Sequence, residues 1–243
     1  MFALFTAGTA FGAAAFAGIH AMAPKSQLYG KTFFGTPGQG KQLALTYDDG
    51  PNDAATPHLL DVLAKHDVKA AFFLIGKHVK QHPEIVRRIV AEEHLIGNHT
   101  FTHPNLALCS EQQIREELTS CEKALQEIGC PLSILPSGQK LFRPPFGGRR
   151  PATLRIAREL GFLPVMWSVW CFDWNQTTTD RVEQHAIRRI SGGDIIVLHD
   201  GGHKRMGVDR KHTVEATERL LLKYKGEGFE FVSIPKMLGQ AIS

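Results

Sequence analysis

The sequence has few of the features that would assign it to a special class of protein. Its 243 residues include only four cysteines, none in a C-x-x-C pair, which argues against a thiolate zinc site or a redox dithiol. No run of Lys or Arg is longer than a pair, and no basic stretch is interleaved with aromatic residues. The formal net charge of +4 therefore gives little reason to expect a nucleic-acid partner. A Gly-x-Gly-x-x-Gly motif is also missing, so a dinucleotide-binding sheet is not expected.

Charge is absent from the beginning of the chain. Residues 1–22 contain no Lys, Arg, Asp or Glu, and about 20 apolar residues are enough to cross a bilayer. Residues 1–23 are therefore expected to be a membrane anchor or a signal-like segment, with membrane association through residues 1–22. An apolar helix packed on the domain is the alternative. Lys25 and Lys31 follow the segment, and the positive-inside rule would leave the remaining chain cytoplasmic.

Residues 24–243 are expected to form one domain, because neither a linker nor a repeat interrupts them. Apolar runs typical of buried strands alternate with helix patterns to the C-terminus, which predicts parallel strands joined by crossover helices. The number of such units favours an α/β fold of TIM-barrel type, a distorted (β/α)7-8 barrel. Strands are expected at residues 43–47, 70–75, 95–98, 141–143, 163–169, 194–198 and 229–234. Helices are expected to begin at Thr56-Pro57 with Thr56 as N-cap, at Pro83, after Ser110, at Pro151, near Thr179 and near Thr213.

Polar residues follow several of these apolar runs. Asp48, His99, Arg143, Asp173 and His199 each come after an expected strand. The carboxyl ends of parallel barrel strands share one face. Residues that are distant in sequence are therefore expected to meet at one mouth of the barrel.

The first two polar segments suggest a metal site. Asp48 and Asp49 point in different directions if they end a strand, so one can bind a metal while the other remains free as a base. His99 and His103 are four residues apart, a spacing that places two imidazoles on one side of a helical turn. One carboxylate and two imidazoles make three protein ligands, which leaves an open position for water.

The later segments add groups that suit polar chemistry. Arg143 precedes two prolines, and its guanidinium can hold a carboxylate through two hydrogen bonds. The N–H of Phe146 is the first main-chain donor after Arg143. Asp173 lies beside Trp174, which either walls an apolar pocket or belongs to the core. His199 ends an apolar strand beside other polar groups and is suited to proton transfer.

Together these segments resemble the polysaccharide deacetylase family, the NodB-homology domain of carbohydrate esterase family 4, over about Gln42 to Ser233. Tyr47 stands where the family more often has Phe, and Trp170 where it often has a first Asp, which puts the conformation of that loop and its substrate contacts in doubt. The matching segments are Thr46-Tyr47-Asp48-Asp49-Gly50-Pro51, His99-Thr100-Phe101-Thr102-His103, Arg143-Pro144-Pro145-Phe146-Gly147, Asp173-Trp174 and Val197-Leu198-His199-Asp200.

The resemblance implies a role for each matching residue. Asp48 would be the catalytic base, oriented by Arg143, and His199 the acid, oriented and tuned by Asp173. The N–H of Phe146 would help to bind an oxyanion. The remaining roles concern the cofactor and the substrate: Asp49, His99 and His103 would hold a divalent metal, commonly zinc with Co²⁺, Ni²⁺ or Mn²⁺ as alternatives, and Trp174 and Val197 would line the pocket for the acetyl methyl group.

The predicted function is that of a metal-dependent hydrolase that removes acetyl groups from a carbohydrate. N-acetyl groups are the first expectation and O-acetyl groups the second. The partner would be an N-acetylated glycan, with chitin oligomers, peptidoglycan and an exopolysaccharide all open. The expected location is membrane-associated or secreted, on the extracytoplasmic side, which conflicts with the orientation that the positive-inside rule gives for Lys25 and Lys31. The alternatives are a metal-dependent amidohydrolase acting on a formyl group or cyclic amide, and a non-catalytic carbohydrate-binding barrel.

Overall fold

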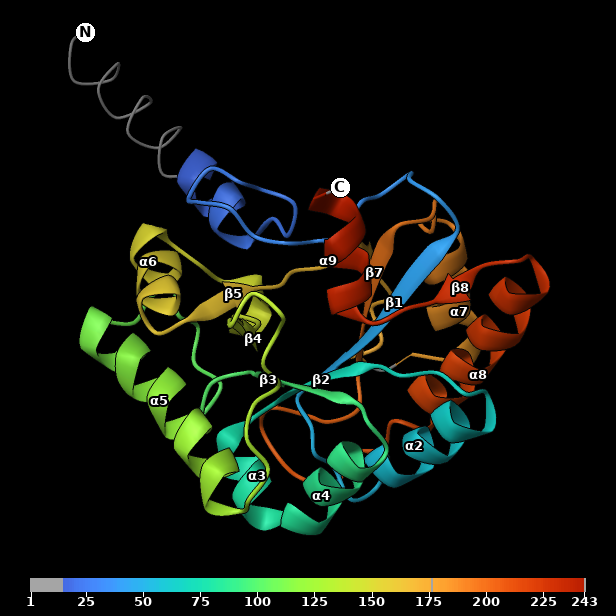
Figure 1. Cartoon of the computed structure of the whole chain (residues 1–243), viewed down its shortest axis with the longest axis horizontal. Coiled ribbons are helices and arrows are strands. Elements are labelled where there is room, and N and C mark those ends of the chain that lie inside the picture. Colours follow the sequence, from blue (N-terminus) through green and yellow to red (C-terminus); the bar gives the residue numbers. More distant parts are fainter. Residues whose placement is uncertain (1–14, 176, 243) are drawn as a thin grey trace, which may run out of the picture.

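The computed structural model describes residues 15–175 and 177–242. Within them, parallel strands curl into a distorted barrel, and most of the helices cover its outer side (Figure 1). The predicted α/β barrel fold is therefore confirmed. The strands are β1 (Gln42–Asp48), β2 (Ala71–Leu74), β3 (Leu95–Asn98), β4 (Lys140–Phe142), β5 (Phe162–Pro164), β6 (Val169–Trp170), β7 (Asp194–His199) and β8 (Glu230–Phe231). The helices are α2 (Thr56–Lys65), α3 (Gly76–Gln81), α4 (Pro83–Ala91), α5 (Glu111–Glu127), η1 (Pro145–Gly147), α6 (Pro151–Glu159), α7 (Thr179–Ile187), α8 (Lys211–Gly226) and α9 (Ile234–Ile242).

Strand β1 is the centre of the sheet. The strand order is β5-β4-β3-β2-β1-β7-β6, and β8 pairs with the start of β1. Strands β5 and β6, at the two ends of this order, are joined directly by residues 165–168. In this gap Phe33 forms a parallel bridge with Val165. The segment that precedes β1 therefore lies along the gap between β5 and β6, which is the open side of the barrel.

The alternation of side chains along β1 divides the core in two. Leu43, Leu45 and Tyr47 belong to the larger cluster, which packs against the surrounding helices. Ala44 belongs to a second cluster inside the barrel, which also contains Met237 of α9. Because side chains alternate between the faces of a strand, Asp48 at the end of β1 shares the interior face with Ala44.

The structure corrects several expectations about the elements. The strand expected at residues 163–169 is two strands, because the chain bends between β5 and β6. The last expected strand ends at Phe231 and is followed by α9. Thr56 begins α2, but Ala55 is its N-cap. The hydroxyl of Thr56 instead accepts from the N–H of Asn52 and donates to Asp200.

The apolar start of the chain is described only in part. Residues 1–14, which make up most of the expected anchor or signal-like segment, lie outside the described residues. Residues 15–22 are helical and are followed by a turn that packs on the domain. No helix among the described residues is long and apolar enough to cross a membrane. Membrane association remains a prediction.

Candidate active site

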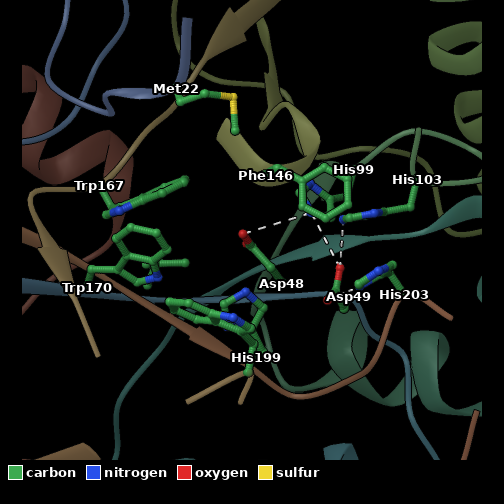
Figure 2. A pocket seen from close by; sticks show the side chains of 12 residues that line it. Met22, Asp48, Asp49, His99, His103, Phe146, Trp167, Trp170, His199 and His203 are labelled. Carbon is green, nitrogen blue, oxygen red and sulfur yellow. Dashed lines mark ion pairs between the residues drawn. The ribbon is translucent and has the colours of Figure 1, made fainter. Parts of the chain in front are cut away.

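The pairing of β1 with β7 brings two of the predicted residues together. Asp48 and His199 are the last residues of these strands, and they are partners in the parallel register. Val197, two residues before His199, lies in the interior cluster, so His199 points to the same interior face. Figure 2 shows both side chains directed into one cavity, which they line.

Asp48 is held by a fully buried arginine. An Nη1–H of Arg143 donates to Oδ1 of Asp48 at 2.7 Å and to Oγ1 of Thr46 at 2.8 Å. Other guanidinium N–H groups donate to the carbonyls of Val165 and Met166. The sequence suggested that Arg143 would donate two hydrogen bonds to a carboxylate, but it donates only one to Asp48. Its other donors bind the carbonyls in the bend between β5 and β6. Oδ2 of Asp48 is not part of this contact.

Asp49, His99 and His103 form a compact, buried group at the same mouth. Oδ1 of Asp49 lies 3.1 Å from Nε2 of His103 and 3.6 Å from Nε2 of His99. One ligand atom from each residue lies within 4.8 Å of the others. The two histidines are not on a helical turn, as the spacing suggested. They lie on an irregular loop in which Thr100 and His103 have φ values of 68° and 65°.

The protonation of this group suits a divalent cation. Burial lowers the pKa of His99 to about 4, and its Nδ1–H donates to the carbonyl of Arg143 at 2.8 Å, which leaves the Nε2 lone pair facing Asp49. Burial acts to raise the pKa of Asp49, but the close approach of the His103 and His203 rings holds it well below its usual value. Nε2 of His103 is 3.1 Å from the buried Oδ1 of Asp49, but among the described residues no group makes a well-aligned hydrogen bond to this oxygen. An ionised carboxylate beside imidazole nitrogens fits zinc and related metals.

His199 is oriented by a buried carboxylate. Nδ1 of His199 donates to Oδ1 of Asp173 at 2.9 Å, and its main-chain N–H donates to Oδ2 at 2.7 Å. Thr213 also donates to Oδ2. Burial by itself lowers the pKa of His199, but the charge and hydrogen bond of Asp173 outweigh it and raise the pKa to about 9. His199 is therefore an imidazolium at neutral pH in the metal-free protein.

The cavity itself has a polar floor and apolar walls. Its volume is about 260 Å³. Trp174 stacks on Trp170 with ring centroids 4.6 Å apart and meets the His199 ring edge-on at 5.8 Å. Phe146 has a left-handed φ of 57°, and its ring is 46% exposed at the rim. The walls comprise Met22, Phe146, Trp167, Trp170, Trp174 and Val197.

The structure brings the predicted residues together at one place. Eight of them line the cavity: Asp48, Asp49, His99, His103, Phe146, Trp174, Val197 and His199. Arg143 and Asp173 lie behind it, each bonded to a lining residue.

Four further lining residues were not among the predicted site residues. Trp167 lies within the segment expected as one strand and Trp170 directly follows it, and the positions of both depend on the bend between β5 and β6. His203 follows β7, and its ring stacks on His103 at 4.6 Å. Met22 belongs to the apolar segment that was assigned to the membrane or to secretion. The sequence did offer a signal for two of the four: Trp170 stands at a position of the family motif where substrate contacts were in question, and His203 begins the segment 203–212 that was expected to shape the groove.

Comparison with known proteins agrees with this geometry. Residues 35–165 match the model of the family described as polysaccharide deacetylase. A peptidoglycan-N-acetylglucosamine deacetylase of Bacillus cereus is 36% identical over 206 residues, which cover 84% of this chain and 70% of the relative. A chitooligosaccharide deacetylase of Bradyrhizobium sp. is 36% identical over 203 residues, covering 81% of this chain and 90% of the relative.

A solved structure of the same family is also similar to this chain. It is that of a pseudoenzyme of carbohydrate esterase family 4 from Bacillus anthracis, with a TM-score of 0.75 and 28% identity, covering 86% of this chain and 69% of that one. The same fold thus occurs without activity. The motifs, the barrel and the sequence matches nevertheless agree, and the resemblance inferred from the sequence is confirmed. This chain belongs to the polysaccharide deacetylase family, hydrolases that act on carbon–nitrogen bonds other than peptide bonds.

Proposed function

We propose that this chain hydrolyses the N-acetyl group of N-acetylglucosamine units in a glycan, releasing acetate. The observation that carries the proposal is the position of Asp48 and His199. They are register partners at the ends of β1 and β7 and line one cavity beside Asp49. A base and an acid on two sides of a reacting group are what amide hydrolysis requires.

Asp49, His99 and His103 would hold a divalent metal, with zinc as our first choice and Co²⁺, Ni²⁺ or Mn²⁺ as alternatives. The support is the unpartnered Oδ1 of Asp49 beside two imidazoles. When bound, such an ion supplies Lewis-acid chemistry, because it polarises a carbonyl and makes water more acidic. The remaining steps depend on side chains of this chain.

Asp48 would act as the general base. Arg143 binds its Oδ1 and fixes the carboxylate plane, so that Oδ2 remains available to take a proton from the attacking water. Phe146 would donate its main-chain N–H to the oxyanion that forms from the acetyl carbonyl. Removal of one such donor typically costs about 2.7–4 kcal/mol in other hydrolases.

His199 would act as the general acid. Its raised pKa of about 9 keeps a proton on the ring at neutral pH, and this proton can pass to the leaving amine. Asp173 orients the ring and stabilises its charge. Trp174 and Val197 would receive the acetyl methyl group, since both line the apolar side of the cavity.

The substrate class follows from the two relatives. One is named for peptidoglycan N-acetylglucosamine and the other for chitooligosaccharides, and N-acetylglucosamine units are common to both polymers. We therefore place the activity on such a glycan, outside the cytoplasm. The non-catalytic alternative is disfavoured because Asp48 and His199 are both present and are register partners at the ends of β1 and β7.

A substrate panel tests this function. The purified chain with added Zn²⁺, Co²⁺ or Ni²⁺ should release acetate from N-acetylglucosamine oligomers and from peptidoglycan fragments, and the reaction should stop on chelation and resume when metal is added back. Acetate is measured by a coupled assay. Turnover of formamides or cyclic amides, with none of the acetylated glycans, would show that the amidohydrolase alternative is correct.

Substitution of Asp48→Asn tests the base. We expect acetate release to fall about 10²–10⁴-fold, the range for loss of a general base, while the metal content of the protein is unchanged. Asp53→Asn, an exposed change in the same turn, is the control and should keep full activity. If Asp48→Asn lost metal together with activity, or kept its activity, Asp48 would not be the base.

Substitution of Asp173→Asn tests the acid. Loss of the carboxylate charge destabilises the imidazolium, so the pKa of His199 must fall, and the alkaline limb of the kcat/KM profile should move to lower pH. NMR titration of the His199 ring in the metal-free protein reports the same change directly. Asp180→Asn, which removes an exposed carboxylate that pairs with Arg219, is the control. An unmoved alkaline limb in Asp173→Asn contradicts the assignment of His199.

A further inference from the structure

A short arm of the chain, residues 17–26, packs against the active-site cavity. The arm is folded on itself: the N–H of Ala23 donates to the carbonyl of Ile19 at 2.9 Å, and His20 and Ser26 are hydrogen-bonded through their side chains at 2.7 Å. The hydroxyl of Tyr29 donates to the carbonyl of Ala17 at 2.8 Å. These contacts give the arm one defined shape.

Arg149 fastens the arm to the loop that follows β4. Its side chain is 1% exposed, and its guanidinium donates to the carbonyls of Ala23 at 2.6 Å, Ser26 at 2.8 Å and Gly147 at 3.0 Å. Its main-chain N–H donates to the carbonyl of Ala21 at 3.0 Å. Among the described residues, no carboxylate forms an ion pair with Arg149, and burial alone lowers its pKa. Main-chain carbonyls of the arm and of Gly147 therefore satisfy this buried cation.

The arm places Met22 in the cavity wall. Met22 lines the same cavity as Asp48 and Trp167, and it is 42% exposed, which places it at the rim. Figure 2 shows its side chain across the cavity from His199, between the sides occupied by Trp167 and Phe146. The arm also reaches the loop itself, since a Cβ added at Gly147 would lie 3.6 Å from the carbonyl oxygen of Met22.

We propose that Met22 is a specificity-determining residue that packs on the sugar rings next to the reacting N-acetyl group, and that Arg149 is a positioning residue that fixes the arm to the Phe146–Gly147 loop. The ligand class, an N-acetylglucosamine oligomer, rests on the proposed function. Its rings present C–H faces that suit an apolar wall, and the flexible thioether of methionine adapts to such a surface.

The two residues should affect different kinetic constants. Met22 lies at the rim and touches the substrate away from the reacting atoms, so its contact is equal in the ground state and the transition state and changes KM rather than kcat. Arg149 acts through the loop that carries the Phe146 N–H. Its loss should lower kcat, because small displacements of an oxyanion donor slow the chemical step.

The chain offers a direct optical test for Met22. All three of its tryptophans line this cavity, so tryptophan fluorescence reports on ligand binding there. The tetramer of N-acetylglucosamine is titrated into the full chain carrying Asp48→Asn, which suppresses turnover, with and without Met22→Ala. We expect Kd to rise about tenfold, the lower end for lost apolar contacts in a binding pocket. In the chain with Asp48 intact, Met22→Ala should raise KM by a similar factor at constant kcat.

Ile19→Ala is the matched control, because Ile19 lies one turn earlier on the same arm and is 66% exposed. It should leave Kd unchanged. Equal Kd values for the Met22→Ala, Ile19→Ala and parent proteins, or no saturable fluorescence change in the parent protein, would overturn the Met22 assignment. Binding of the tetramer without acetate release by the unmodified chain would instead count against the proposed hydrolysis, and the Kd values would still decide the role of Met22.

Arg149→Lys tests the positioning role, because lysine keeps the charge but cannot reach several carbonyls at once. We expect kcat to fall at constant KM, together with faster hydrogen exchange of the amides in residues 17–26. Unchanged kcat with unchanged exchange would overturn this role. The Met22 measurements do not depend on how the Arg149 variant folds.

Discussion

The buried guanidinium of Arg143 is the contact on which the geometry of the whole site depends. It joins the end of β1, through Thr46 and Asp48, to the carbonyls of Val165 and Met166 in the bend between β5 and β6. Its own carbonyl accepts from His99. One residue therefore orients the proposed base and fixes the tautomer of a proposed metal ligand. It also fixes the segment that joins β5 and β6, the two end strands of the sheet. A buried arginine is costly unless its donors are satisfied, and here the barrel supplies an acceptor for each of these contacts.

The distribution of charge around the cavity follows from this arrangement. Asp48 is paired with Arg143 and Asp173 with His199, so each of these carboxylates has a cationic partner within the protein. Asp49 lies among the imidazoles of His99, His103 and His203 and forms no ion pair with a Lys or Arg among the described residues. A carboxylate held ionised in a buried place without a resident cation is a place where a divalent ion is strongly favoured. The same electrostatics therefore support the different roles that we propose for the three carboxylates, as base (Asp48), metal ligand (Asp49) and orienting group (Asp173).

The sequence predicted the barrel and the polar residues at its strand ends because both depend on local patterns. Asp48, His99, Arg143 and His199 each follow an apolar run, and the rule that parallel strands end on one face was enough to bring them together. The helical interpretation of His99 and His103 was wrong, because spacing alone does not reveal a loop with left-handed residues. Met22 and Trp167 were missed because their positions depend on how the arm and the β5–β6 bend pack against distant parts of the chain, and no local pattern contains that information.

The central claim is that one divalent ion sits between Asp49, His99 and His103. It is tested most directly by a crystal structure of the zinc-loaded chain, with anomalous scattering measured on both sides of the zinc absorption edge. We expect a single strong anomalous peak within about 2.0–2.2 Å of a carboxylate oxygen of Asp49 and of Nε2 of both histidines, with Asp48 still bonded to Arg143. A peak elsewhere, or zinc bound through Asp48 instead of Asp49, would contradict it.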